Sequence, residues 1–489
     1  MKNFIFSCVL LFFIGGITAQ FPVDTQYQTI VCSPPALPLF LGTVTDNTVP
    51  DPIIITRITS PVGNYYPHHE YAKTQPWNAD ATIYKFYTVA IYDATTHQKI
   101  RDLPGSPLYP TYWSNTNPDI LYGFKENGDI KAYSISTEDI SLLSHIYFDE
   151  DSQTDYDILK LGPGEGNIDK NDHYVAFVGK KGSDMDVIIY DLQTHAVIHK
   201  KTYAGAWGNG TGMPEYVDWV SVSQSGNYVL IMWDHNTAPV SNPFNGHYGV
   251  EVYNTTDMQY LRRIVDYGNH GDFAYAQDGN EVFVQFWGPT GTLNMYYLDR
   301  MERVVLQTHT DIGQHGHISG RNINRPGWAY ATLSELNYGV TIAVKLDTSG
   351  IVEYFGHHYS SCSNYKKSPM SAPSPNGEKI MFKSDFGNSA NTAEVYEFEA
   401  QKAGQANVNF ENKTSIKVYP NPTNDFINIA GEKIIQKLRI INQTGQTLKT
   451  FNTLNNKQVK ININDLKTGV YYILIEGDKQ LGRHVFLKK

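Results

Sequence analysis

The sequence predicts an all-β protein that consists of a seven-bladed β-propeller followed by a small C-terminal β-sandwich. Its 489 residues include 34 Tyr, 22 Phe, 39 Gly and 24 Pro, a mixture that favours strands joined by many turns. A strand signature recurs at an even period along most of the chain. Beyond the N-terminal segment, no stretch of about ten residues keeps the apolar period of a helix, which argues against a parallel α/β fold.

The recurring signature is a β-branched or aromatic run that ends in Tyr or Leu and a polar residue, with a turn after it. Its seven copies are centred on Tyr92, Tyr133, Tyr190, Tyr253, Leu298, Leu346 and Tyr396. Their average spacing of about 51 residues is typical of one four-stranded blade per copy. Seven copies therefore predict seven blades.

Other segments fit the remaining strands of a blade. Residues 190–203 and 253–265 each hold two β runs around a turn, which predicts the outer hairpin of a blade. Residues 227–234, 280–287 and 378–385 each follow a Ser-Gly, Asp-Gly or Asn-Gly turn and predict inner strands.

The two ends of the chain differ from this middle region. Residues 1–19 hold one charge, Lys2, followed by an apolar run and small residues, so we predict a signal peptide. Residues 20–400 form the predicted propeller, and the polar stretch 401–416 is typical of a linker. No other stretch approaches the length of a membrane span. We therefore expect an exported, monomeric chain with no transmembrane segment.

Residues 417–489 alternate apolar and polar side chains between turns, which predicts the small antiparallel sandwich. The Tyr-Pro-Asn-Pro motif from Tyr419 to Pro422, the segment from Gly469 to Tyr472 and the basic last residues resemble the C-terminal sorting domain of type IX secretion. The resemblance implies contact with the type IX secretion machinery and export across the outer membrane, to the medium or the cell surface.

Charge is divided unevenly between these parts. The whole chain is formally −10, but residues 417–489 hold 12 basic and 5 acidic residues, a net charge of +7. Residues 20–416 hold 26 basic and 44 acidic residues, a net charge of −18. A nucleic-acid binder would show a basic stripe, so this class of partner is excluded.

Removal of the signal peptide takes Cys8 with it and leaves Cys32 and Cys362. Two cysteines do not make a disulfide framework. They can form one disulfide, remain unpaired, or contribute a metal ligand, and the sequence leaves these alternatives open.

Propellers bind ligands on the loops around the central channel, so polar clusters at strand ends are the candidate sites. In the segment 64–80, alternation would place His69, Tyr71, Lys73 and Gln75 on one strand face, with His68 on the other. Burying polar groups on an inner strand costs free energy unless the groups contact water or a ligand. The alternative is a solvated loop with aromatic packing.

Three His-rich loops fall in successive predicted blades and contain His270, then His315 and His317, then Cys362. Histidines two apart on a strand project together, a workable spacing for two ligands of one metal. We predict a divalent metal site from these four residues, with zinc as the first choice and manganese or calcium as alternatives. The alternative is that these side chains form structural hydrogen bonds to the backbone of their loops.

Tyr248, Arg262 and Arg263 form a further candidate group. In β-elimination on a uronic acid, a base removes the proton next to the carboxylate, a cation neutralises that carboxylate, and an acid protonates the leaving oxygen. Tyr and Arg suit these tasks. The sequence lacks a Gly-x-Ser-x-Gly elbow, a P-loop, a dinucleotide fingerprint and a His-Glu-x-x-His motif.

The middle region resembles propeller-type polysaccharide lyases, namely ulvan lyases and, more distantly, oligogalacturonate lyase. The His-His-Glu-Tyr-Ala-Lys segment from His68, the His-Gly-Asp segment from His270, the Gln-His-Gly-His segment from Gln314 and the blade turn at 374–379 support this resemblance. It implies His68 or His69 as acid and base, with assistance from Tyr248. It also implies substrate contacts from Tyr71, Lys73 and Arg262 or Arg263, and a metal near His270, His315, His317 and Cys362.

The leading hypothesis is a secreted lyase that cleaves a uronic-acid polysaccharide, with ulvan as the first substrate. The alternative is a non-catalytic propeller that binds glycan or protein at the cell surface, which the net charge of −18 favours because it repels a polyanion. A metal-assisted hydrolase is a third possibility.

Overall fold

The computed structural model describes residues 23–24, 33–49, 52–59, 68–86, 90–233, 244–287, 291–308, 316–333, 339–387, 393–399, 417–441, 447–452, 455–477 and 480–489. The predicted signal peptide and linker lie outside these ranges. The chain divides into two compact units, Met1–Gln401 and Lys402–Lys489. Within the described ranges, no helix has the length and apolar character needed to cross a membrane.

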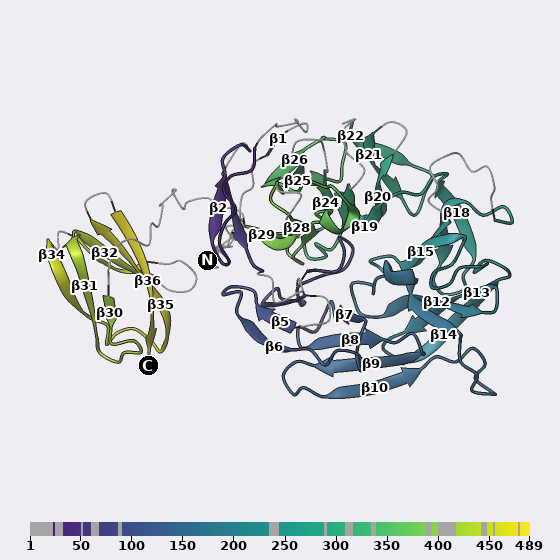
Figure 1. Cartoon of the computed structure of the whole chain (residues 1–489), viewed down its shortest axis with the longest axis horizontal. Helices are drawn as coiled ribbons and strands as arrows, with labels where there is room; N and C mark the ends of the chain where they lie inside the picture. Colours follow the sequence, from purple (N-terminus) through teal and green to yellow (C-terminus); the bar gives the residue numbers. More distant parts are fainter. Residues whose placement is uncertain are drawn as a thin grey trace, which may run out of the picture. The chain divides into compact units, whose positions relative to one another are not determined.

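The described part of the first unit forms seven antiparallel sheets, and most have four strands. In Figure 1 these sheets follow one another in chain order about a common centre, an arrangement consistent with propeller blades. Apart from two short 3-10 turns, η1 (Gly162–Gly164) and η2 (Tyr365–Lys367), no helix occurs among the described residues. The predicted all-β class is confirmed.

Three sheets come from the first part of this unit. Their strands in sheet order are β4 (Ile83–Phe86), β5 (Ala90–Asp93) and β6 (Lys99–Asp102); β7 (Thr111–Trp113), β8 (Ile120–Phe124), β9 (Asp129–Ser134) and β10 (Ile140–His145); and β11 (Ile158–Leu161), β12 (Tyr174–Lys181), β13 (Asp184–Asp191) and β14 (Ala196–Tyr203). Trp77 adds an isolated bridge to Tyr84 on the inner side of β4.

The next three sheets repeat this order. Their strands are β15 (Val217–Val222), β16 (Tyr228–Trp233), β17 (Gly249–Asn254) and β18 (Tyr260–Val265); β19 (Gly271–Tyr275), β20 (Glu281–Trp287), β21 (Thr292–Tyr297) and β22 (Arg303–Gln307); and β23 (His317–Ser319), β24 (Trp328–Thr332), β25 (Val340–Lys345) and β26 (Val352–His357), with β1 (Val23–Asp24) on its outer edge.

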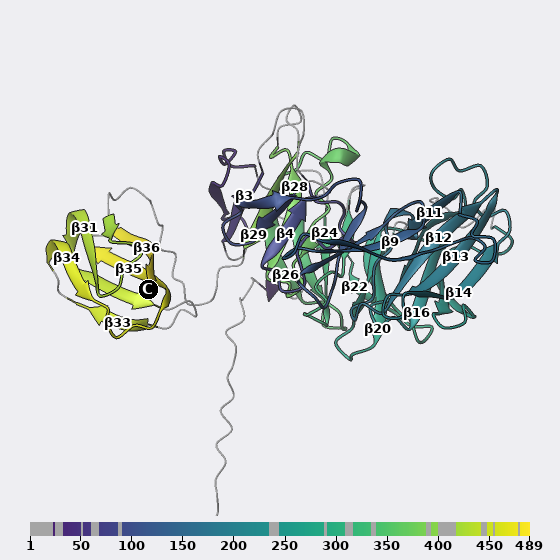
Figure 2. The same ribbon diagram turned by 90° about the horizontal axis from the view of Figure 1, so that it is seen from below.

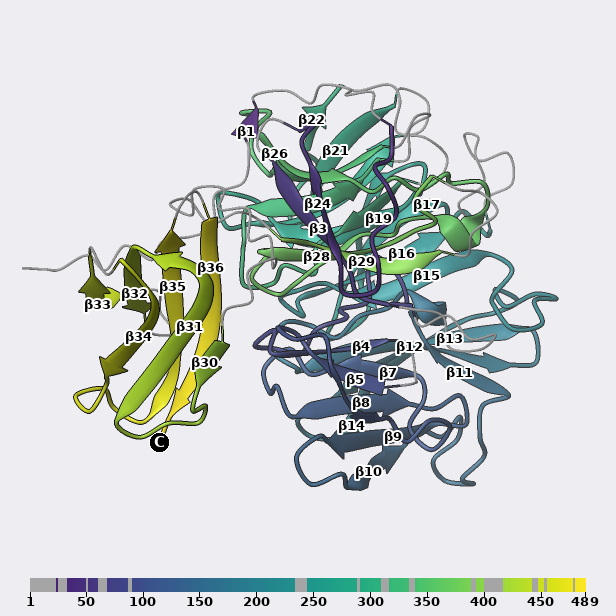
Figure 3. The ribbon, with the colours of Figure 1, turned by 60° about the vertical axis from the view of Figure 1, so that its left-hand side comes forward.

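The last sheet joins the two ends of the unit. Its order is β27 (Ala372–Pro373), β28 (Lys379–Ser384), β29 (Glu394–Glu399), β3 (Ile53–Arg57) and β2 (Thr43–Asp46). Tyr396 of β29 lies opposite Arg57 of β3, and Figure 3 shows β3 beside β28 and β29. β2 and β3, from the beginning of the first unit, therefore complete the sheet that β27, β28 and β29 from its end begin.

The repeated sequence signature lies at the third strand of six sheets and at β5, the middle strand of the three-stranded sheet. Its copies lie in β5, β9, β13, β17 and β29, or directly after β21 and β25. The large residue packs between sheets, as Tyr253 and Leu346 show by their complete burial. The polar residue stabilises the following turn: Asp191 Oδ1 accepts the Gln193 backbone N–H at 2.7 Å, and Asp347 Oδ1 accepts that of Ser349 at 2.8 Å.

The described part of the second unit holds seven strands in two sheets. In sheet order these are β30 (Lys417–Tyr419), β31 (Phe426–Ile435) and β34 (Asn456–Asn462), and then β33 (Thr447–Phe451), β32 (Lys437–Ile441), β35 (Gly469–Gly477) and β36 (Gln480–Lys488). Ile427 and Ile461 of the first sheet pack with Leu438, Ile473 and Phe486 of the second in one buried apolar cluster. Figure 2 shows the strands of this unit in yellow.

Candidate functional site

The candidate site lies where four connections enter the inner strands of neighbouring sheets. His270 immediately precedes β19, and His317 begins β23, which contacts β19. Ser368 lies shortly before β27, and Tyr71 lies in the segment that leads towards β4. Residues nearly 300 positions apart are therefore brought to one place.

The histidines of this site lie against each other and against Tyr71. The ring centroids of His270 and His317 are 4.5 Å apart, with an angle of 34° between the rings. The Tyr71 hydroxyl lies 3.0 Å from His270 Nδ1 in a hydrogen bond, and the Tyr71 ring meets His317 edge-on at 5.2 Å. Tyr365 and the Ser368 hydroxyl, 3.4 Å from His317 Nδ1, also lie against His317.

Burial and negative charge keep the phenol of Tyr71 protonated. Its pKa is raised well above the ordinary value, first by burial and then by Glu165, Tyr365 and Asp218. Burial also raises the pKa of Tyr365. Both phenols are therefore hydrogen-bond donors at neutral pH.

Lys73 is held beside this group rather than free to reach a ligand. Its ammonium lies 2.9 Å from Glu165 Oε2 and 3.9 Å from the centre of the Trp219 ring. The residue is 4% exposed. The predicted substrate contact of Lys73 would require this ion pair to open.

A buried ion pair between Arg321 and Asp272 lies next to the site. Arg321 donates two hydrogen bonds of 3.0 Å to Asp272, which also accepts the Gly320 backbone N–H at 2.8 Å. Gln75 donates to the carbonyls of Arg321 and Pro373. This network fixes β19, β23 and β27 relative to one another.

His68 and His69 do not belong to a strand, although alternation predicts one. The backbone turns here, with Thr74 N–H bonded to the Tyr71 carbonyl. His69 is fully buried, and its Nε2 lies 2.7 Å from the Met370 carbonyl. Burial, with a further contribution from Lys383, lowers the pKa of His69 to about 3. His69 is thus a neutral structural group, and of the two only His68 is partly exposed.

Tyr248, Arg262 and Arg263 lie elsewhere, which corrects the prediction that they reach the central site. Both arginines are on β18, the outermost strand of its sheet. Arg263 stacks on the Tyr248 ring at 3.2 Å and pairs with Glu251 at 2.9 Å, and Arg262 donates to the Leu298 carbonyl. Arg263 is therefore engaged within its own sheet, and Arg262 with the residue that follows β21 of the next sheet.

The predicted metal ligands are brought together only in part. His270 and His317 adjoin, and two imidazoles are suited to zinc, manganese and similar divalent ions. His315 and Gln314 lie outside the described residues. Cys362 has a free thiol whose pKa burial raises to about 11. Within the described ranges no three His, Cys, Asp or Glu side chains form a metal-binding group, so Cys362 does not complete a site with the two histidines.

Four residues of this site were not predicted from the sequence, namely Glu165, Asp218, Tyr365 and Ser368. None lies in a His-rich motif, although Tyr365 and Ser368 follow the loop that contains Cys362. Their role comes from the order of the sheets, which a local motif does not encode. Cys32, the other cysteine considered for a disulfide, lies outside the described residues.

Comparison with known proteins identifies the second unit and the fold of the first. Residues 417–488 match the secretion system C-terminal sorting domain. The chain is therefore exported across the outer membrane, to the cell surface or the medium. No curated protein matches the chain.

Two solved structures share the fold of the first unit. One is an oligogalacturonate lyase from Vibrio parahaemolyticus, 12% identical, covering 76% of this chain and 99% of its own, with a TM-score of 0.51. The other is an oligogalacturonate lyase in complex with manganese, 12% identical, covering 76% of this chain and 98% of its own, with a TM-score of 0.52. At this identity the likeness shows a lyase-like propeller fold and no more.

Proposed function

We propose that this protein is a secreted polysaccharide lyase that cleaves a uronic-acid polysaccharide by β-elimination in a seven-bladed propeller. The observation that supports it best is the convergence of Tyr71, His270 and His317 at the inner ends of neighbouring sheets. Perturbed and mutually bonded titratable groups at the centre of a fold are typical of active sites. The shared fold with oligogalacturonate lyases agrees with this proposal.

Each group has a chemical task in this proposal. His270, His315 and His317 would hold a divalent metal, with Gln314 as a further candidate ligand. When bound, such a metal supplies a positive charge that acidifies the proton next to a carboxylate. Tyr71 keeps its proton because its pKa is raised, so it can donate to the leaving oxygen. His68, the partly exposed member of its pair, is the candidate base.

The substrate class is a uronic-acid polymer, and two members of it are supported differently. The motifs of the sequence favour ulvan, whereas the fold neighbours favour chains of galacturonate. β-Elimination needs only a carboxylate next to the acidic proton and a leaving oxygen beyond it. The same site chemistry therefore applies to both.

Product analysis tests this proposal. The purified chain would be incubated with ulvan, oligogalacturonate and alginate, and the products weighed by mass spectrometry. A lyase adds no water to the two fragments, and one fragment carries a double bond. Fragments that each carry the full mass of a hydrolysis product would replace the proposal with a hydrolase, and no fragments from any polymer would exclude both.

The net charge of −18 on residues 20–416 favours a second candidate, a non-catalytic propeller that binds glycan or protein at the cell surface. It predicts retention of a ligand without turnover. The same incubations separate the two candidates, because a binding protein leaves the polymer mass unchanged.

A further inference from the structure

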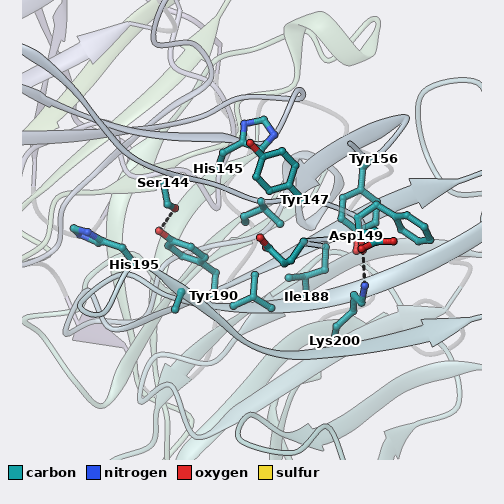
Figure 4. A pocket seen from close by; sticks show the side chains of 14 residues that line it. Ser144, His145, Tyr147, Asp149, Tyr156, Ile188, Tyr190, His195 and Lys200 are labelled. Atoms are coloured by element: carbon teal, nitrogen blue, oxygen red, sulfur yellow. Dashed lines mark hydrogen bonds between the residues drawn. The ribbon is translucent and has the colours of Figure 1, made fainter. Parts of the chain in front are cut away.

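A separate cleft lies at the outer edge of the first unit, between the sheet that ends in β10 and the sheet that ends in β14. Its volume is about 760 Å³, within the range of small-molecule sites. The residues that line it belong to β10, the segment after β10, β13 and β14. Figure 4 shows the His145 and Tyr147 rings near each other, and Ser144 bonded to Tyr190.

One wall of the cleft is fixed by ion pairs. His145 lies between two carboxylates, with Nδ1 2.8 Å from Asp129 and Nε2 2.9 Å from Asp155. The Tyr147 ring packs on the His145 ring at 4.3 Å. Because His145 is held at both nitrogens, the Tyr147 ring is held in place as well and its cost of ordering on binding is small.

Hydrogen bonds and cation–π contacts also hold the end of the cleft near Phe148 in place. Lys200 donates to the Phe148 carbonyl at 2.8 Å, and the ammonium groups of Lys181 and Lys200 lie 5.2 and 5.1 Å from the Phe148 ring centre. Tyr156 donates to Asp186 at 2.7 Å. These hydrogen bonds and cation–π contacts hold Phe148 and Tyr156 in place as one wall of the cleft.

The floor is apolar, and the rim offers polar groups. Ile188 and Tyr190 are buried beneath the cleft, with the Tyr190 hydroxyl bonded to Ser144. Glu150, in the segment after β10, and His195, between β13 and β14, are exposed. A ligand in the cleft would meet an aromatic face, an apolar floor and hydrogen-bonding groups.

We propose that this cleft binds a neutral, hydroxyl-rich segment of a saccharide chain, with Tyr147 as a stacking platform and Glu150 and His195 as hydrogen-bonding partners. A sugar ring presents apolar C–H faces and a rim of hydroxyls, which match these two kinds of surface. The cleft has room for a short oligosaccharide, and export places the protein where extracellular polysaccharides occur.

Charge selects the neutral sugar over a uronate. Asp129 and Asp155 are paired with His145, and Asp129 also with Lys131, so these two carboxylates are already partnered. The exposed carboxylates of Asp149 and Glu150 line the cleft, with the ammonium group of Lys200 in the lining and that of Lys181 beside Phe148. Both ammonium groups already contact Phe148 or backbone carbonyls. A carboxylate on the ligand would therefore meet mainly like charge.

Affinity gel electrophoresis of the full chain tests the site. Galactan, xylan and laminarin serve as neutral polymers and polygalacturonate as the uronate. We expect at least one neutral polymer to retard the wild-type chain and Tyr147→Ala to weaken that binding by about five-fold or more, the effect of a lost aromatic contact. His195→Ala should weaken it by a smaller factor.

Tyr260→Ala is the matched control, because Tyr260 is a 47% exposed tyrosine on β18, the outer strand of another sheet. It should bind like the wild type, and thermal unfolding should show that all three variants are folded. Retardation by none of the neutral polymers, equal loss in the control, or Tyr147-dependent binding of polygalacturonate alone would overturn the proposal. The readout needs no turnover, so it fails or succeeds independently of the proposed lyase activity.

Discussion

Two groups of His, Tyr and Arg side chains look alike in the sequence and differ in the structure. The inner group unites Tyr71, His270 and His317 from three separate connections. The outer group joins Glu251 of β17, Arg263 of the adjacent β18 and Tyr248, which directly precedes β17. The comparison teaches that polar residues close in sequence satisfy each other across a hairpin, whereas a site draws on residues that only the order of the sheets brings together.

Activity should separate the two groups most strongly. His270→Ala removes a member of the inner group, and we expect a loss of turnover on a uronate polymer of about 100-fold or more. Tyr248→Phe keeps the ring under Arg263 and should change turnover less than about twofold. Equal losses of turnover in the two variants would show that the inner group has no special part in catalysis.

Metal binding should follow the same division. After dialysis against a chelator and reloading with Mn²⁺ or Zn²⁺, we expect the wild-type chain to hold about one ion, as measured by elemental analysis. His317→Ala should lose most of this ion, and Cys362→Ser should keep it because Cys362 does not join the two histidines. If His317→Ala retained the ion, the inner group would not be the metal site.

The buried ion pair beneath the inner group should dominate the stability of this region. Asp272→Ala leaves the 4% exposed Arg321 without its carboxylate, and we expect the free energy of unfolding to fall by about 3–5 kcal/mol. On the outer surface, Asp299→Ala removes an exposed partner of Arg300 and should lower the free energy of unfolding far less, because exposed ion pairs contribute little to stability. Urea denaturation measures both, and similar costs would contradict the burial argument.

Lys383 gives a smaller effect of opposite sign. It is 6% exposed, its ammonium donates a hydrogen bond to Met370 Sδ at 3.3 Å, and burial lowers its pKa to about 8. Lys383→Met should therefore stabilise the chain at neutral pH by about 1–3 kcal/mol. Lys345→Met, which removes a partly exposed partner of Asp347, is the control and should not stabilise the chain.

The pH dependence of this effect has a defined direction. Between about pH 8 and the ordinary lysine pKa of 10.5, the unfolded chain binds a proton at Lys383 that the folded chain has lost. The free energy of unfolding should therefore rise with pH across that window. The rise should be smaller in Lys383→Met, and an equal rise in both chains would assign it to other groups.

Much of the fold could be predicted because each sheet repeats a local rule. Tyr253 fills the space between sheets, and Asp191 or Asp347 bonds the turn that follows the third strand, so the sequence shows the period directly. His270 and His317 could be predicted as a pair for a related reason, since both occupy the same place at the start of an inner strand.

The remainder of the site could not be predicted because it depends on distant partners. His69 appears available in the sequence, yet its Nε2 is bound to the carbonyl of Met370, about 300 residues away. Arg262 and Arg263 appear suited to a carboxylate, yet the order of their sheet places them on its outer strand. Tyr365 and Ser368 enter the site only because β27 follows β23 around the centre.

The most direct test of the central claim is the rate at which the wild-type chain and His317→Ala release unsaturated uronate from ulvan and from oligogalacturonate, followed by ultraviolet absorbance. The account predicts a steady rise with the wild-type chain on at least one substrate and almost none with the variant, although both are folded. No rise with the wild-type chain on either substrate, or the same rise with both chains, would contradict it.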